Sequence, residues 1–203
     1  MTVTANPIPE AVHLGADELP FVTLPDASLL KVLQVREKEG LWIVQAVFQA
    51  GYEVQTHRHT GPVWGYTVSG AWKYKEYDYV NRAGSFLYEP AGSVHTLQCI
   101  EDGTDVWFHM YGANLNLDAD GNVESVTDGR SALAGYLALC EMQGFAPPDV
   151  VTDGSIDRRA VAARGRVECP RGGRERAASP CGPGVPRYAR LRHPDLTRSE
   201  PCR

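Results

Sequence analysis

Between residues 20 and about 118, short apolar and aromatic runs alternate with glycine-containing turns. The runs are LLKVLQV from Leu29, LWIVQAVF from Leu41, VWGYTVSG from Val63, AWKYKEYDY from Ala71 and TDVWFHMYG from Thr104. The punctuating glycines are Gly40, Gly51, Gly61, Gly70, Gly84, Gly92 and Gly103. Many short strands at near-regular spacing are typical of a β-sandwich or β-barrel rather than of a parallel α/β sheet. The pattern therefore predicts an all-β fold.

The period of the apolar positions changes after a turn at residues 118–121, DADG. Over residues 131–145 the apolar side chains recur at the helical spacing i, i+3, i+4, i+7, at Leu133, Tyr136, Leu137 and Cys140. This spacing predicts one C-terminal helix, for which Ser131 is the expected N-cap. Two prolines at 147 and 148 then close the domain.

The formal net charge of -5 hides two regions of opposite sign. Residues 1–151 carry 8 Lys+Arg against 19 Asp+Glu, whereas residues 152–203 carry 12 Arg, no Lys and 6 Asp+Glu. The acidic body offers no basic stripe for a nucleic-acid backbone. We therefore divide the chain into an N-terminal arm (1–19), a β-domain (20–150) and an Arg/Pro/Gly-rich tail (151–203).

The tail has almost no apolar periodicity, so we expect it to be disordered, because it buries too little surface to offset its ordering entropy. One interpretation is a basic arm for nucleic acid or an anionic partner. Arginine without lysine, with proline, glycine and alanine, is also what GC-rich DNA yields when translated in the wrong frame. We favour this frameshift artefact over a functional arm.

No segment approaches the run of about 20 apolar residues that a membrane span needs, and the N-terminus lacks the features of a secretory signal. We therefore expect a cytoplasmic protein without a membrane or nucleic-acid partner. Its five cysteines, an odd number without a CxxC pair, are then expected to be free thiols.

Three histidines carry the strongest chemical signal. His57 and His59 are two residues apart, and alternate residues of a β-strand point to the same face. His95 follows a turn set by Pro90 and Gly92 and opens the next strand. A lone buried histidine is usually a hydrogen-bonded core residue, but two glycine-framed motifs at this spacing favour a site for a first-row divalent ion.

The two segments resemble the paired motifs of the cupin superfamily, G-x5-H-x-H-x3-(E)-x6-G and G-x5-P-x-G-x2-H-x3-N. The matching residues are Gly51, His57, His59 and Gly70 in the first motif and Gly84, Pro90, Gly92 and His95 in the second. The resemblance implies an all-β, jelly-roll-like double-stranded β-barrel with the metal at its centre.

Two departures from these motifs bear on function. Val63 stands where many cupins have a glutamate ligand, and Cys99 stands at the final Asn position. We interpret the site as three histidines without the carboxylate of oxalate-degrading or germin-like cupins. Such a site leaves coordination positions for an anionic bidentate substrate and for O2.

This arrangement resembles the three-histidine non-haem iron dioxygenases. Within them, HRHTG, YEPAGSVHT, LDADGNV and YLALCEMQG resemble the group of the 2,4'-dihydroxyacetophenone dioxygenase and the acetylacetone-cleaving dioxygenase. The resemblance runs from about Val12 to Pro148 and implies Fe(II) as the cofactor. It also implies an acidic residue six positions before the third histidine, which is Glu89 here and could accept the N–H of a metal-bound imidazole. The alternative is a surface glutamate before a proline.

Further candidates follow from strand alternation. In DVWFHMY, Phe108 and Met110 share one face, which we expect to line the substrate pocket with Val63, while His109 points away. Tyr66 could hydrogen-bond a substrate carbonyl, although a strand aromatic is more often core. Lys75 could supply positive charge near an enolate, although solvated edge lysines are commoner.

These observations predict a metal-dependent dioxygenase that cleaves a C–C bond of a hydroxyketone or β-diketone with O2. The substrate would chelate the ion as its enolate. One alternative is a non-oxidative cupin enzyme, such as an isomerase or hydrolase. The other is a non-catalytic small-molecule-binding cupin of the sensor type, which is disfavoured because the sequence pattern offers no helix-turn-helix or other DNA-reading module beside the barrel. Exposed barrel strands commonly pair, so we expect a homo-oligomer, either dimer or tetramer.

Overall fold

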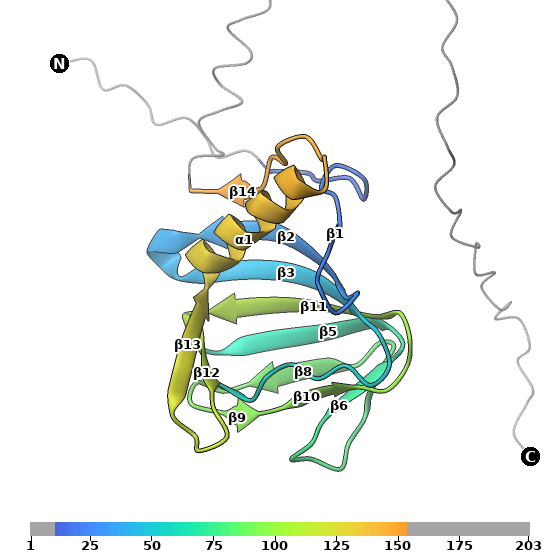
Figure 1. Cartoon of the computed structure of the whole chain (residues 1–203), viewed down its shortest axis with the longest axis vertical. Helices are drawn as coiled ribbons and strands as arrows, with labels where there is room; N and C mark the ends of the chain where they lie inside the picture. The colour runs from blue at the N-terminus through green and yellow to red at the C-terminus, as the bar shows by residue number, and fades with distance from the viewer. Residues whose placement is uncertain (1–10, 154–203) are drawn as a thin grey trace, which may run out of the picture. The chain divides into compact units, whose positions relative to one another are not determined.

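The computed structural model describes residues 11–153, which form mostly β-strands with one α-helix (Figure 1). The strands are β1 (Val22–Thr23), β2 (Leu29–Arg36), β3 (Leu41–Phe48), β4 (His57–His59), β5 (Val63–Ser69), β6 (Ala71–Tyr74), β7 (Asn81–Arg82), β8 (Phe86–Glu89), β9 (Val94–His95), β10 (Leu97–Cys99), β11 (Thr104–Tyr111), β12 (Ala113–Leu117), β13 (Val123–Asp128) and β14 (Val151–Thr152). The 3-10 helix η1 spans Glu37–Glu39 and α1 spans Gly129–Met142. The predicted all-β fold with one helix is confirmed.

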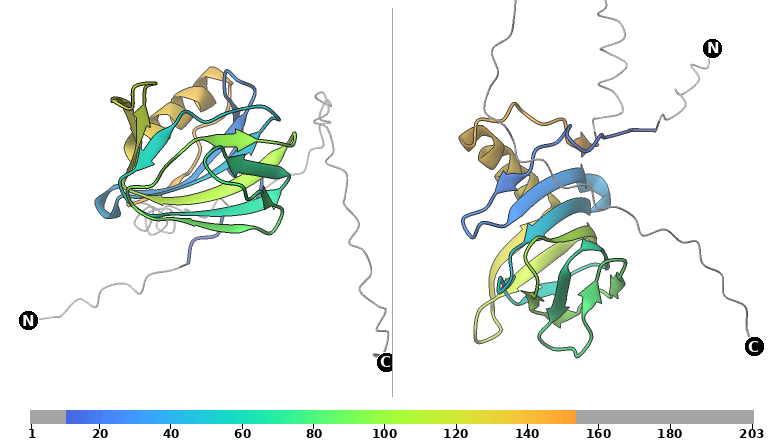
Figure 2. Two further views of the ribbon diagram at one scale, coloured as in Figure 1. Left: turned by 90° about the horizontal axis from the view of Figure 1, so that it is seen from below. Right: turned by 90° about the vertical axis from the view of Figure 1, so that its right-hand side faces the viewer.

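The strands form three sheets around a common interior (Figure 2). The largest has the order β1-β2-β3-β11-β5-β8, with β14 added beside β2. The other two have the orders β10-β6-β7 and β13-β12-β4-β9. The long pairings of β3 with β2 and of β11 with β3 and β5 are antiparallel.

The predicted alternation determines which side chains reach that interior. On β5, Val63, Gly65 and Thr67 are buried while Tyr66 and Val68 are exposed. On β11, Val106 and Met110 are buried while Trp107 and Tyr111 are exposed. On β11 this is the parity expected from the sequence, whereas on β5 the inward positions belong to Val63 and Thr67 and not to Tyr66, which was predicted to reach a substrate.

Two predicted boundaries are wrong in detail. The segment AWKYKEYDY forms a strand only as far as Tyr74, because the chain then turns. The predicted turn at residues 118–121 is present, and it joins β12 to β13, a strand that was not predicted. The helix begins earlier than predicted, since Asp128 is its N-cap and accepts a hydrogen bond from the Ser131 backbone N–H.

The buried face of α1 also differs from the prediction. Tyr136 and Cys140 are buried, whereas Leu137 is 40% exposed. The Tyr136 hydroxyl donates to the Pro20 carbonyl oxygen at 2.6 Å, which ties the helix to the chain before β1. Both Cys140 and Cys99 are buried free thiols, and the other cysteines lie outside the described residues.

The ordered domain extends beyond the predicted limits of residues 20 and 150. Leu19 is buried in the core and Leu14 packs against it. At the other end, β14 pairs with β2, and Asp153 accepts a 2.7 Å hydrogen bond from Arg36 Nε. The Arg-rich tail after residue 153, predicted to be disordered, lies outside the described residues. No helix in the described part of the chain has the length and apolar character to cross a membrane.

Gly70 provides a test of how tightly β5, β6 and β11 meet. Its φ of +75° is left-handed, and an added Cβ would lie 2.7 Å from the Thr104 Cα. We expect Gly70→Ala to lower the free energy of unfolding by about 3 kcal/mol, since it combines backbone strain with a clash against backbone.

Gly84→Ala is the matched control, because Gly84 has a φ of +86° but no heavy atom within 4 Å of the added Cβ. It should cost only about 1 kcal/mol of strain. Urea denaturation of both variants measures the difference. If both variants lost the same free energy of unfolding, the close approach of Gly70 to Thr104 would contribute nothing to stability.

Candidate metal centre

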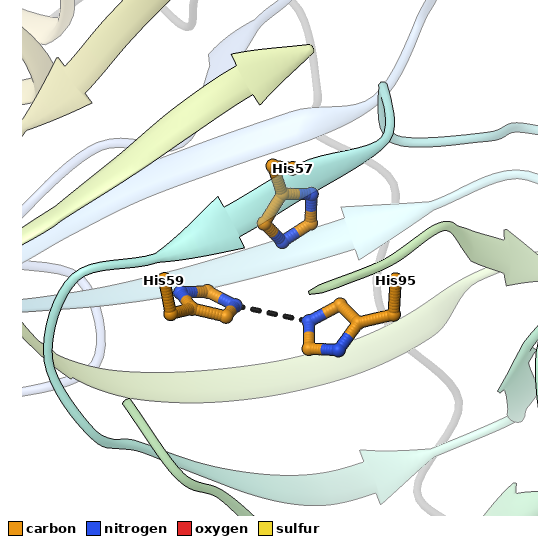
Figure 3. Close-up of side chains that lie close together, drawn as sticks. All are labelled: His57, His59 and His95. Atoms are coloured by element: carbon orange, nitrogen blue, oxygen red, sulfur yellow. Dashed lines mark hydrogen bonds between the residues drawn. The ribbon is translucent and has the colours of Figure 1, made fainter. Parts of the chain in front are cut away.

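Two adjacent strands bring the three histidines together (Figure 3). His57 and His59 lie on β4 with Arg58 exposed between them, and the Cα of His57 pairs with that of His95 on β9. All three side chains are at least 95% buried. The predicted grouping of these histidines on one side of the sheet is confirmed.

The histidine nitrogens converge on a common point. Each imidazole offers a nitrogen within 4.8 Å of those of the other two, and Nε2 of His59 lies 3.0 Å from Nε2 of His95. Two ligands bound at about 2.1 Å and at right angles to one another lie about 3 Å apart. The spacing of these nitrogens therefore suits ligands of one small cation.

His57 is prepared to bind as a neutral ligand. Its Nδ1 donates to the Gln55 carbonyl oxygen at 2.7 Å, which leaves Nε2 as the free acceptor. Burial lowers the pKa of His57 to about 4, although the hydrogen bond to Gln55 opposes the shift. A cation at neutral pH therefore meets little competition from protons at this residue.

Glu89 on β8 reaches the same point from the neighbouring sheet. Its Oε2 lies 2.7 Å from Nε2 of His59 and 3.2 Å from Nε2 of His95. Burial alone would raise the pKa of Glu89, but its contacts with the two imidazoles outweigh burial and lower the pKa to about 2. The site thus holds a carboxylate anion beside the three imidazoles.

This placement changes two expectations. The first concerns the atoms that Glu89 contacts. Its carboxylate lies beside Nε2 of His59 and Nε2 of His95, the nitrogens that converge on the common point, and not beside an imidazole N–H on the side away from the metal, as predicted. Its Cα pairs with that of Val63 across β5 and β8. The carboxylate expected to be missing at Val63 is therefore supplied from the paired position on the adjacent strand.

Tyr74 on β6 holds Glu89 in place. Its hydroxyl donates to Glu89 Oε1, and its ring stacks on His95 with centroids 3.8 Å apart. Burial raises the pKa of Tyr74 well above its usual value, so the hydroxyl stays protonated and continues to donate. Tyr74 was not among the predicted residues, although the alternation in AWKYKE puts it on the face opposite Lys73 and Lys75.

These residues fit a divalent metal ion. Oε2 of Glu89 and Nδ1 of His59 are buried without a hydrogen-bond partner in the described structure, although Oε2 is close to two nitrogens. Oε2 is thus close to these nitrogens without hydrogen-bond geometry, as expected of ligand atoms that are directed at a shared ion rather than at one another. Imidazole nitrogens with one carboxylate are ligands that first-row divalent metals accept.

A cavity of about 160 Å³ opens beside His57, His59 and Glu89. Its walls are mostly apolar, and they include Leu30, Val44, Phe48 and Leu97. The residues predicted to line a substrate pocket, Val63, Phe108 and Met110, all border it. Asn114, whose Cα pairs with that of His59, adds a polar group that strand alternation alone did not indicate.

Two predicted site residues lie elsewhere. Tyr66 is on the outer face of β5, 51% exposed, because its neighbours Gly65 and Thr67 occupy the inward positions. Lys75 lies just after β6 and forms an exposed ion pair with Glu53. Neither residue borders the cavity, so neither placement is compatible with the predicted contact to a substrate there. His109 points outward, as predicted.

Comparisons with known proteins agree with the fold. Residues 9–114 match the family model of the ChrR cupin-like domain. An RmlC-like cupin protein from Ralstonia eutropha JMP134 has a similar structure, with a TM-score of 0.65 and 31% sequence identity, covering 70% of this chain and 95% of that chain. A second protein with a cupin-like fold from the same organism has a TM-score of 0.64 and 27% identity, covering 75% and 95%.

A more distant likeness is to an acetylacetone dioxygenase from Acinetobacter johnsonii. Its TM-score is 0.59 at 17% identity, covering 68% of this chain and 98% of that chain. At this identity the likeness shows a shared fold alone. No curated protein matches the chain.

Proposed function

Because the chain belongs to the ChrR cupin-like domain family and gathers three histidines and a carboxylate at one apolar cavity, we propose that it is a metal-dependent dioxygenase that cleaves a C–C bond of a small hydroxyketone or β-diketone. The observation that carries the proposal is the composition of the cavity. Fe(II) is the ion we propose, held by His57, His59 and His95.

The cavity wall favours a small neutral substrate. None of the described residues that border the cavity is a lysine or arginine, so no fixed cation is available to pair with a substrate carboxylate. Its volume of about 160 Å³ is below the range of roughly 300–1,000 Å³ that is usual for larger ligands. A small ketone with an apolar body fits both properties, whereas a dicarboxylate fits neither.

We assign substrate binding and proton transfer to different side chains of the cavity. When bound, the ion supplies Lewis acidity that favours the enolate of a chelating ketone. Glu89 is the one carboxylate among the described residues of the cavity, and we assign its Oε2 the proton that the ketone loses. Tyr74 orients that carboxylate through Oε1. Phe108 and Met110 exclude water from the reacting carbons.

One observation favours a second function. If Glu89 binds the ion, the ligands are three histidines and a carboxylate. This is the ligand set of the oxalate-degrading and germin-like cupins, from which Val63 was expected to distinguish this chain. An additional anionic ligand favours divalent ions such as Zn or Mn and leaves fewer positions for O2. The second candidate is therefore a non-oxidative metal enzyme, an isomerase or a hydrolase, acting on the same class of ketone.

Oxygen consumption separates the two functions. The full chain, loaded with Fe(II) under anaerobic conditions, is mixed with acetylacetone, with an aryl hydroxyketone and with oxalate as a charged control. We expect one O2 consumed per ketone and none with oxalate, because each oxygenated carbon of the broken bond receives one oxygen atom. Product formed without O2 would overturn the dioxygenase and support the second candidate. Binding without turnover in either atmosphere would overturn both.

A further inference from the structure

The outer surface of the largest sheet carries a continuous layer of aromatic side chains. Tyr66 on β5 lies between Trp107 of β11 and Phe86 of β8 in the ladder, and Trp64 pairs with Tyr88 in the next row. The Trp64 ring also contacts that of Tyr111, with centroids 6.0 Å apart. We call this the outer aromatic face and define it by Trp64, Tyr66, Phe86, Tyr88, Trp107 and Tyr111.

The outer aromatic face is unusually exposed for side chains of this kind. The exposed fractions are 51% for Tyr66, 68% for Phe86, 54% for Tyr88, 36% for Trp107 and 37% for Tyr111. With about 200 Å² for each aromatic side chain, these five expose roughly 500 Å². If the outer aromatic faces of two copies packed against one another, they would bury roughly 1,000 Å² in total, which is the lower limit for a specific protein interface.

Charge selects this face as the place where two copies can meet. Residues 1–151 have a net charge of -11, from 8 Lys+Arg and 19 Asp+Glu, so two copies of the domain repel one another over most approaches. The outward positions of β5 and β8, and those of β11 from Trp107 to Tyr111, hold no lysine, arginine, aspartate or glutamate. Tyrosine and tryptophan are also the residues enriched at interface centres.

We propose that a second copy of this chain packs on the outer aromatic face, related by a two-fold axis, to form a homodimer. The surface on either side of Trp107 is hollowed, with a cavity of about 350 Å³ toward β8 that holds no charged side chain and one of about 490 Å³ toward β2 that Lys31 and Arg36 also line. In a two-fold interface the same surface serves both copies, so the raised side chains of one copy enter the hollows of the other. This is a face-to-face contact and not the pairing of strand edges expected from the sequence.

The dimer also supports the wall of the candidate metal centre. Trp107 and Tyr111 alternate along β11 with Phe108 and Met110, which border the cavity on the opposite face. A partner against the outer side of β11 restrains the strand that forms this wall. The interface itself does not depend on the proposed reaction.

Sedimentation velocity of the full chain over a range of concentrations tests the proposal. We expect a species of twice the 22.2 kDa chain mass. Phe86→Glu puts a charge into the interface twice, once from each copy, and should weaken the dimer by about 100-fold or more. Phe86 is too exposed for this change to unfold the monomer, and an unchanged circular dichroism spectrum and metal content verify that it has not.

Val123→Glu is the matched control, since Val123 is 48% exposed on β13, at the edge of another sheet. It should leave the dimer unchanged. A wild-type chain that stays monomeric at its highest soluble concentration overturns the proposal, as does a dimer that Val123→Glu dissociates and Phe86→Glu does not. A larger assembly supports the proposal if Phe86→Glu splits it and overturns it otherwise.

Discussion

Replacement of His95 by alanine is expected to remove metal binding and to lower activity by at least about 100-fold, because even side chains that only support a ligand account for 10–100-fold. His95 is 1% exposed, and its Nε2 lies within 3.2 Å of both His59 and Glu89. Without it, two imidazoles and a carboxylate remain, and the group that stacks on Tyr74 is lost.

Thermal unfolding with and without metal measures this loss independently of activity. At an ion concentration of about 100 times Kd the wild type should gain about 2.7 kcal/mol, which raises Tm by roughly 5–10 °C for a domain of this size. His95→Ala should gain nothing. His13→Ala, which removes an exposed histidine, is the control and should respond like the wild type. A metal-induced rise of Tm in His95→Ala equal to that of the wild type would remove His95 from the ligand set.

The histidine cluster could be predicted because its cause is local. Two histidines at i and i+2 share a face of any strand, and the Pro90–Gly92 turn brings His95 back to pair with His57. The same alternation placed Phe108 and Met110 toward the interior. Each of these inferences needs only the period of a strand.

The position of Glu89 could not be predicted because it depends on which strands become neighbours. Glu89 lies 26 positions after Val63, and only the pairing of β5 with β8 puts the two side by side. The first motif lies on one strand and has no carboxylate at Val63, because the residue that supplies it lies on another strand. A carboxylate at Glu89 instead of at position 63 keeps the same groups around the site, but it changes the sequence motif.

Tyr66 and Lys75 were misplaced for a different reason. Their functional groups suit a substrate carbonyl or enolate, but whether they reach the site depends on the face of the strand that they share or do not share with the histidines. The inward residues Gly65 and Thr67 already settled the parity of β5. The same parity exposes Tyr66 and makes it part of the outer aromatic face.

Glu89→Gln is expected to reduce kcat by about 100- to 10,000-fold at saturating metal, the usual contribution of a positioned proton acceptor. Glutamine keeps the size of the side chain and can still accept from Tyr74, so the effect isolates the loss of charge and basicity. Metal affinity should fall by no more than about 10–100-fold, because three imidazoles remain. Steady-state rates over a metal titration separate the two effects.

Two further variants locate the effect at Glu89. Tyr74→Phe removes the hydroxyl that orients Oε1 while leaving the carboxylate, so it should lower kcat less than Glu89→Gln does. Glu76→Gln, at a carboxylate that accepts from the Thr96 backbone N–H outside the cavity, should leave both kcat and metal affinity near wild type. If excess metal restores Glu89→Gln to full activity, Glu89 acts only as a ligand, and the proton that the ketone loses must be received elsewhere. In that case the site functions as three histidines and a glutamate, a ligand set that favours the non-oxidative enzyme over the dioxygenase.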